Sequence, residues 1–246
     1  MNKILVGNSG FVELLDTFGD DLTVVNAARV SFHKEAKEFT ARDEGLVKYL
    51  AKHDHISPFF HPQARFRIKM PIFVAREWFR HTVGLARNEV SRRYVDDKPE
   101  VWIPDEFRER DPNLKQGSKE SIIPNNATVR EMYCEAMRNA LDAYDKLLEA
   151  KVAPEVARAV LPQSMYTEFI ETGSLAAYAR ICRLRLDPHA QHEIQQFAIA
   201  ITDVLEPHFP VSWKALMSDS KDDITRVKKA GESELELNRD YGAGGR

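Results

Sequence analysis

Apolar side chains recur at three- and four-residue steps along residues 126–151, which is the clearest regular pattern in the chain. This spacing puts them on one face and predicts a long amphipathic helix; the positions are Val129, Tyr133, Met137, Leu141, Tyr144 and Leu148. Residues 64–70 follow a different period, because apolar and basic side chains alternate strictly there. A period of two predicts a half-buried β-strand. One chain that contains both periods is expected to form an α+β fold.

Shorter patterns indicate the other elements. Asp20 or Asp21 can cap a helix over residues 22–30, and Pro71 can open a helix over residues 72–82. We expect further helices at residues 43–53, 155–160, 174–186 and 189–205, and a strand at residues 166–171. Gly84 is expected to end the helix before it and to open an arginine-rich loop that runs to Tyr94.

We expect one domain over residues 1–218, with a small and mostly antiparallel sheet flanked by long helices. No internal repeat or linker divides this stretch. Residues 219–246 are rich in charge and finish with Gly-Ala-Gly-Gly-Arg, which predicts a polar C-terminal tail with a frayed end.

Charge and composition narrow the possible functions. The net charge of −3 argues against binding nucleic acid through overall charge. No apolar run is long enough to cross a bilayer, and the first residues lack a secretory signal, so we expect a cytoplasmic protein without membrane attachment. Cys134 and Cys182 fit no disulfide framework and no metal-binding spacing, and we propose no metal ligands.

Basic residues gather between Arg76 and Tyr94. Five arginines stand there against two glutamates: Arg76, Arg80, Arg87, Arg92 and Arg93 against Glu77 and Glu89. Guanidinium groups bind phosphate through paired hydrogen bonds, and Ser91 with nearby backbone amides could complete a phosphate site. A defined anionic ligand would explain this cluster on a mildly acidic protein. Composition alone is equally consistent with an exposed charged loop.

This segment resembles the signature of flavin-dependent thymidylate synthases, RHRxxSxNExSxRY. Asn88-Glu89-Val-Ser91-Arg92-Arg93-Tyr94 matches the second half at every specified position. The first half begins with Arg80-His81 but has Thr82 where arginine is usual, and one extra residue separates the halves. Other blocks along residues 10–210 agree with the family in order and separation; they include residues 52–59, 157–162 and 184–196.

The resemblance implies a binding site for dUMP. Arg93 and Arg158 would contact its phosphate, and Arg185 would contact the uracil ring, where a cation stabilises charge that develops on the carbonyl oxygens. Arg185 and Ser91 are the expected catalytic residues, with Ser91 orienting the nucleotide rather than attacking it. The expected substrate-binding set is Glu77, Arg80, Glu89, Ser91, Arg93, Arg158 and Arg185.

The resemblance also implies FAD. The expected cofactor-binding residues are His55, Ser57, His81, Asn88, Ser174 and Arg180. Ser174 and Arg180 stand where the family usually has asparagine, and Glu77 replaces a glutamine near the nucleotide. An ionised glutamate accepts hydrogen bonds but cannot donate them as an amide does. These changes concern the flavin and base contacts rather than the fold.

The implied reaction is the reductive methylation of dUMP to dTMP. Methylenetetrahydrofolate, a reduced folate, would supply the carbon, and NADPH would reduce the flavin. The resemblance further implies a homotetramer whose active sites take residues from several subunits.

Four alternatives remain open. The same fold could serve a hydroxymethylase that converts dUMP to 5-hydroxymethyl-dUMP. His53-Asp54 could belong to a metal phosphohydrolase, and the arginines could belong to a non-enzymatic nucleotide- or RNA-binding module. A thymidylate synthase that uses a cysteine nucleophile would have to use Cys182, which lies near arginines, because Cys134 falls in the expected long helix.

Overall fold

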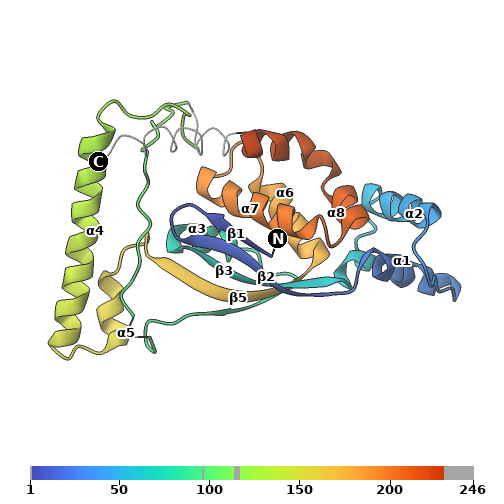
Figure 1. The fold of residues 1–246 in the computed structure, drawn as a ribbon, viewed down its shortest axis with the longest axis horizontal. Helices are drawn as coiled ribbons and strands as arrows, with labels where there is room; N and C mark the ends of the chain where they lie inside the picture. The colour runs from blue at the N-terminus through green and yellow to red at the C-terminus, as the bar shows by residue number, and fades with distance from the viewer. Residues whose placement is uncertain (1, 96, 114–116, 230–246) are drawn as a thin grey trace.

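A five-stranded antiparallel sheet forms the centre of the molecule (Figure 1). The computed structural model describes residues 2–95, 97–113 and 117–229. The strands lie in the order β1 (Lys3–Val6), β2 (Gly10–Phe18), β3 (Gln63–Pro71), β5 (Tyr166–Ser174) and β4 (Leu85–Glu89). Neighbouring strands all pair antiparallel. The sheet and the helices around it confirm the expected α+β fold.

Strand β3 shows why the sheet has one apolar face. Phe66, Ile68 and Met70 are fully buried, whereas Arg65 and Arg67 between them are exposed. In the register of the sheet, Ile68 stands opposite Val12 of β2 and Phe169 of β5. The buried side chains therefore line up across three strands and form one apolar surface, as the alternation predicts.

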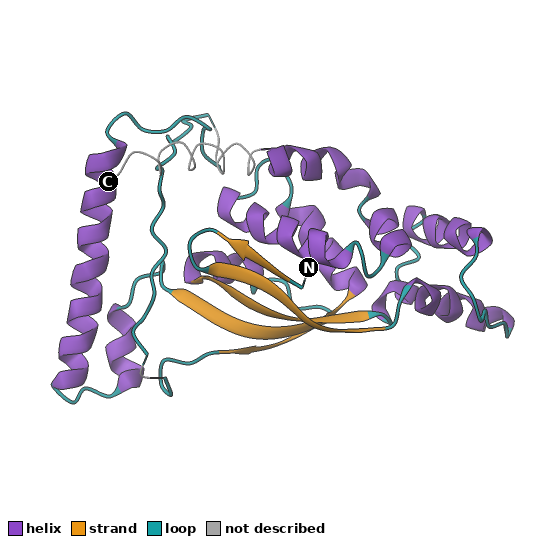
Figure 2. Cartoon of the chain, in the orientation of Figure 1, coloured by secondary structure: helices purple, strands orange, loops and turns teal. Residues whose placement is uncertain are grey.

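Helices cover this apolar face. Helix α3 (Ile72–Trp78) packs on β3 and β5, α6 (Leu175–Arg185) on β5, and α7 (His192–Leu205) on β1 and β2. At one end of the sheet lie α1 (Asp21–Arg29), α2 (Ala41–Lys52) and α8 (Pro210–Leu216); α4 (Asn126–Glu149) and α5 (Pro154–Ala157) lie at the other (Figures 1 and 2). Short 3₁₀ turns follow at Val30–Phe32, Ser57–Phe60, Arg158–Val160 and Ser218–Ser220.

Two neighbouring aspartates fix helix ends. Asp20 is the N-cap of α1, where its carboxylate accepts a hydrogen bond of 2.9 Å from the Thr23 amide. Asp21 reaches a different helix, because it accepts hydrogen bonds from the Val211 and Ser212 amides at 2.9 and 2.8 Å. Those amides begin α8, so Asp21 ties the start of α1 to the start of α8.

Helix α4 confirms the helix expected over residues 126–151, but most of its apolar stripe is only half-buried. Tyr144 alone is buried among the helix residues. The Tyr133 hydroxyl donates to the Trp102 carbonyl at 3.2 Å, and the Ser164 hydroxyl donates to the Met137 sulfur at 2.8 Å. The helix therefore packs against the loop before it and against α5, and leaves part of its apolar side chains accessible.

Two expectations about local structure are wrong. Residues 85–89 form strand β4 instead of the first half of a loop, and the helix after Pro71 ends at Trp78 instead of residue 82. The N-terminal hairpin of β1 and β2 has no counterpart among the expected elements. Its turn contains Gly7 at a positive φ of 61°, a conformation that glycine adopts without steric penalty.

The chain continues in helical form beyond residue 218. Residues 221–229 are helical, and Val227 is buried in the core. Residues 230–246, the rest of the expected polar tail, lie outside the described residues, and the boundary expected at residue 218 stays a prediction. Within the described residues, no helix is both long and apolar enough to span a membrane.

Candidate active site

Side chains from α3, the turn after it and α6 meet around Arg185. We call this group the Arg185 cluster; it consists of Glu77, Arg80, His81, Arg180 and Arg185. The Arg185 Nε donates to His81 Nε2 at 3.1 Å, and its two Nη atoms reach the Glu77 carboxylate at 3.4 Å and the Glu77 carbonyl at 3.1 Å. Glu77 and His81 thus hold the guanidinium of Arg185 from two sides.

The imidazole of His81 is neutral over the physiological pH range. Burial, followed by the nearby charges of Arg185, Arg180, Arg87 and Arg80, lowers the pKa of His81 from 6.5 to about 4. A neutral ring has one nitrogen that accepts a hydrogen bond, and this is the role that Arg185 requires of Nε2. Burial also lowers the pKa of Arg185, while Glu77 opposes that change. The cluster is therefore a half-buried site rich in positive charge.

A buried ion pair between Arg87 and Glu171 contacts the backbone of this cluster. Glu171 on β5 is fully buried, and its carboxylate accepts hydrogen bonds from the Trp78 indole at 3.1 Å and from Arg87 Nε at 2.6 Å. Burial raises the pKa of Glu171, and the positive charge of Arg87 opposes the rise. Arg87 also donates to the His81 carbonyl at 3.4 Å. Neither residue was selected from the sequence as a site residue.

A second group lies where β4 ends, beside α5. Glu89 and Arg158 line a cavity of about 410 Å³, together with Arg92, Met165 and Tyr166 among others. The Thr167 hydroxyl donates to the Glu89 carboxylate at 2.6 Å, and Arg158 Nε donates to the Glu155 carbonyl at 3.4 Å. This cavity joins an exposed guanidinium and carboxyl-bearing side chains to apolar ones, a mixed lining that can accept a ligand with charged and apolar parts.

Ser91 and Arg93 lie two and four residues after Glu89, the last residue of β4. Arg93 Nε donates to the Ser91 hydroxyl at 3.3 Å, and the Arg93 guanidinium lies 5.0 Å from the centre of the Tyr94 ring. Both contacts are local and leave most of the Arg93 donors facing solvent. Ser91 and Arg93 follow the end of β4 in sequence, and Glu89 at that end lines the same cavity as Arg158; we call these four residues the Arg158 group.

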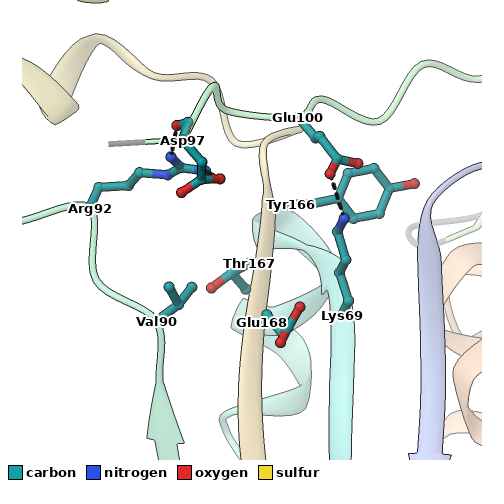
Figure 3. A pocket seen from close by; sticks show the side chains of 8 residues that line it. All are labelled: Lys69, Val90, Arg92, Asp97, Glu100, Tyr166, Thr167 and Glu168. Carbon is teal, nitrogen blue, oxygen red and sulfur yellow. Dashed lines mark hydrogen bonds and ion pairs between the residues drawn. The ribbon is translucent and has the colours of Figure 1, made fainter. Parts of the chain in front are cut away.

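A smaller cavity of about 260 Å³ adjoins the first and shares Val90, Arg92, Tyr166 and Thr167 with it (Figure 3). Its two cations are already paired. Lys69 donates to the Glu100 carboxylate at 2.8 Å, and Arg92 lies 3.3 Å from the Asp97 carboxylate (Figure 3). These two ion pairs hold in place the wall of the smaller cavity, which lies next to the Arg158 group.

Four of the six expected flavin residues belong to elements that meet at the turn before β4. Gly84, at a positive φ of 78°, accepts a hydrogen bond of 3.1 Å from the Ser174 amide, and a Cβ there would lie 3.0 Å from the Ser174 hydroxyl. Arg180 donates to the Val83 carbonyl at 2.8 Å. The 3₁₀ turn that contains Ser57 packs on α6. Ser57, His81, Ser174 and Arg180 thus come from elements that meet at this turn.

Two of the expected flavin residues stand apart from this turn. Asn88 is exposed, and the alternation along β4 turns its side chain to the opposite face of the sheet from Arg87. His55 is exposed after α2, with its ring centre 6.0 Å from that of Tyr49. Ser174 is itself buried, and its hydroxyl caps α6 by accepting from the Ala177 amide.

The cysteines do not supply a nucleophile at these sites. Cys182 is fully buried, its thiol donates to the Ala198 carbonyl, and burial raises its pKa to about 12. A thiol of that pKa is protonated at neutral pH and a poor nucleophile. Cys134 lies half-buried on α4. Among the described residues, no group of three or more histidine, cysteine, aspartate or glutamate side chains is arranged to hold a metal.

Comparison with known proteins identifies the fold. The crystal structure of the UMP/dUMP methylase PolB from Streptomyces cacaoi, bound with 5-Br dUMP, is similar with a TM-score of 0.77 and 30% sequence identity, over 87% of this chain and 97% of that one. The same methylase bound with 5-Br UMP gives a TM-score of 0.75. The chain therefore has the fold of a pyrimidine-nucleotide methylase.

Sequence comparison places the chain more narrowly. A model of the family described as thymidylate synthase complementing protein, Thy1, matches residues 13–211. A flavin-dependent thymidylate synthase of Thermotoga neapolitana is 41% identical over 91% of this chain and 99% of its own length. One from Thermosipho melanesiensis is 38% identical over 89% and 96%. The chain belongs to the Thy1 family.

Proposed function

We propose that the chain is a flavin-dependent thymidylate synthase that methylates dUMP to dTMP. Methylenetetrahydrofolate would supply the carbon, with FAD as cofactor and NADPH as reductant. The observation that carries the proposal is the Arg185 cluster, because it holds a half-buried cation beside a neutral imidazole in a chain of the Thy1 family. Such a site suits a pyrimidine whose carbonyl oxygens gain negative charge during reaction.

The donor set of the turn before β4 fits a flavin dinucleotide. Arg180 would supply positive charge for its phosphates, and His81 would supply a neutral polar ring. Ser57 offers an exposed polar group on the neighbouring 3₁₀ turn, and the exposed His55 precedes that turn by two residues. When bound, the flavin supplies the reducing electrons, and this division of labour leaves binding and electrostatics to the protein.

Arg185 would act on the pyrimidine ring through its charge. Its guanidinium is shielded from bulk water and already oriented by Glu77 and His81, so little reorganisation is needed when negative charge develops on a carbonyl oxygen. Ser91 and Arg93 would hold the nucleotide at its sugar and phosphate end. Because Cys182 is buried and protonated, the chain's own residues supply charge and position, and no thiol attack is needed.

The two groups of site residues are separate within one chain. The cavity beside Arg158 is lined by neither Arg80 nor Arg185. Glu89 is bonded to Thr167 at the start of β5, whereas Gly84 is bonded to Ser174 at its end. We infer that the Arg185 cluster of one copy completes the Arg158 group of another, in a homotetramer with shared active sites. The partly open apolar stripe of α4 supports self-association.

The mass of the product tests the proposed reaction. Purified protein would be incubated with dUMP, methylenetetrahydrofolate, NADPH and FAD, and the nucleotides would be separated and weighed by mass spectrometry. We expect dTMP. A product that carries one additional oxygen would assign the chain as a hydroxymethylase, and unchanged dUMP in the presence of reduced flavin would refute both.

A further inference from the structure

The pair Arg87–Glu171 places two charges where apolar side chains would pack without penalty. The residues stand opposite each other in the register of β4 and β5, on the sheet face that the helices cover. Glu171 is fully buried, and the Arg87 side chain is 15% exposed. A buried ion pair contributes little net stability compared with apolar residues of the same size. Its presence here therefore calls for an explanation other than stability.

The pair holds the segment that leads from α3 to the turn before β4. Glu171 accepts a hydrogen bond from the Trp78 indole, and Arg87 donates to the His81 carbonyl. The Arg87 guanidinium also lies 4.3 Å from the centre of the Phe79 ring. Three of the four residues 78–81, namely Trp78, Phe79 and His81, therefore contact this one ion pair.

The same segment holds Arg185. Both of its contacts, Glu77 just before the segment and His81 at its end, determine where the guanidinium points. A shift of the segment would move the His81 ring and the Glu77 carbonyl together. A continuous series of contacts therefore connects the buried pair, through residues 77–81, to Arg185.

We propose that Arg87 and Glu171 are positioning residues that orient Arg185 through His81 and the Glu77 carbonyl. The proposal deepens the proposed function and depends on it. Arg87 falls between specified positions of the family signature, so the signature alone assigns it no role. The several N–H donors of the Arg87 guanidinium are essential to this role. Nε donates to the Glu171 carboxylate, while Nη2 also donates to the His81 carbonyl.

Charge variants separate positioning from folding. The double variant Arg87→Met/Glu171→Gln removes both charges but keeps an oxygen that accepts from the Trp78 indole, so no buried charge is left alone. Arg87→Lys keeps the charge opposite Glu171 but lacks the fork that reaches the His81 carbonyl. A matched control is Arg108→Met/Glu193→Gln. It removes a half-buried ion pair in which the Arg108 guanidinium, on the loop before α4, lies 2.5 Å from the Glu193 carboxylate on α7.

We expect the double variant and Arg87→Lys to fold, with kcat for dUMP lower by on the order of tenfold to a hundredfold and KM changed less than about threefold. The control should keep the wild-type kcat. In ¹⁵N NMR titrations, assigned with His81→Gln, the pKa of His81 should rise from about 4 in Arg87→Lys, where a positive charge is kept at residue 87 and the rise therefore reports movement of the ring. The groups that set this pKa from the surrounding elements are Arg80, Arg87, Arg180 and Arg185, with Glu77 beside Arg185.

Folded Arg87→Lys and double variants with wild-type kcat, or with a changed KM only, would overturn the proposal. An unchanged pKa of His81 in Arg87→Lys would overturn it as well, and this reading does not depend on turnover. A wild-type protein that makes no dTMP would instead remove the proposed function, and the titration would still decide whether Arg87 sets the position of His81.

Discussion

At the scale of single residues, the site is built by desolvation as much as by charge. His81 is surrounded by four arginines, and Arg185 is in contact with one carboxylate, one carbonyl and one imidazole. Each arrangement would be weak in water, because a high dielectric constant reduces electrostatic energies. Partial burial makes the same contacts strong enough to fix the direction of a guanidinium.

Arg185→Ala should abolish turnover of dUMP without unfolding the protein. One preorganised donor to a developing negative charge contributes about 10²–10³-fold to kcat, and Arg185 is the only cation that both Glu77 and His81 are shown to hold in the described residues. Steady-state kinetics and far-UV circular dichroism measure the two effects. Arg183→Ala, two residues earlier on α6, is the control and should stay active. Normal turnover by Arg185→Ala would remove Arg185 from the chemistry.

The depressed pKa of His81 predicts a loss of stability in acid. The pKa is about 4 in the folded protein and 6.5 in the unfolded chain, so the unfolded chain binds more protons between these values. The free energy of unfolding contributed by His81 therefore decreases as the pH falls from about 6.5 to about 4. Urea unfolding at several pH values should show a shallower decrease for His81→Gln. Thr82→Ala, the neighbouring residue, should keep the wild-type slope, and identical slopes for all three proteins would contradict the prediction.

At the scale of elements, strands β3 and β4 show what the sequence can and cannot predict. Strand β3 is predicted because its buried positions are apolar, so the alternation is visible in the sequence. Strand β4 is missed because its half-buried inward position at its centre is Arg87, whose partner Glu171 lies 84 residues further along the chain. A pattern that treats charge as exposure cannot identify a strand of this kind.

The same limit applies to the site. The family resemblance selects Glu77, Arg80 and Arg185 for the nucleotide and His81 for the flavin, and the structure brings these four residues together. Nothing in the local pattern shows that Arg158 lies with Glu89 at a different place, because this depends on how α5 packs beside β4. Arg87 and Glu171 could have been found only as a pair of opposite charges on facing strands, which requires the register.

Asp21→Ala should lower the free energy of unfolding by about 1–2 kcal/mol. Its buried carboxylate accepts from the first free amides of α8, and no other side chain is shown to do so within the described residues. Chemical denaturation measures the change. Asp16→Ala is the control, since its carboxylate is exposed and reaches Arg65 only at 3.4 Å, and it should change stability by less than about 0.5 kcal/mol. Equal effects of the two substitutions would show that Asp21 does not cap α8.

At the scale of the whole molecule, the long sheet separates the two groups of site residues. Strand β5 runs from the α5 end of the molecule, where Thr167 binds Glu89, toward Ser174 at the start of α6 (Figure 1). We propose that a single nucleotide site takes the Arg185 cluster and the Arg158 group from different copies of the chain. The family resemblance leads to the same arrangement through its shared active sites.

Complementation between two inactive variants tests this central claim most directly. Arg158→Ala and Arg185→Ala chains would be co-expressed with different tags, and assemblies that carry both tags would be purified and assayed with dUMP. Shared sites would pair an intact Arg185 cluster with an intact Arg158 group in about a quarter of random contacts, so we expect about a quarter of the wild-type turnover. Mixed assemblies as inactive as either variant alone, beside an active wild-type protein, would contradict the account.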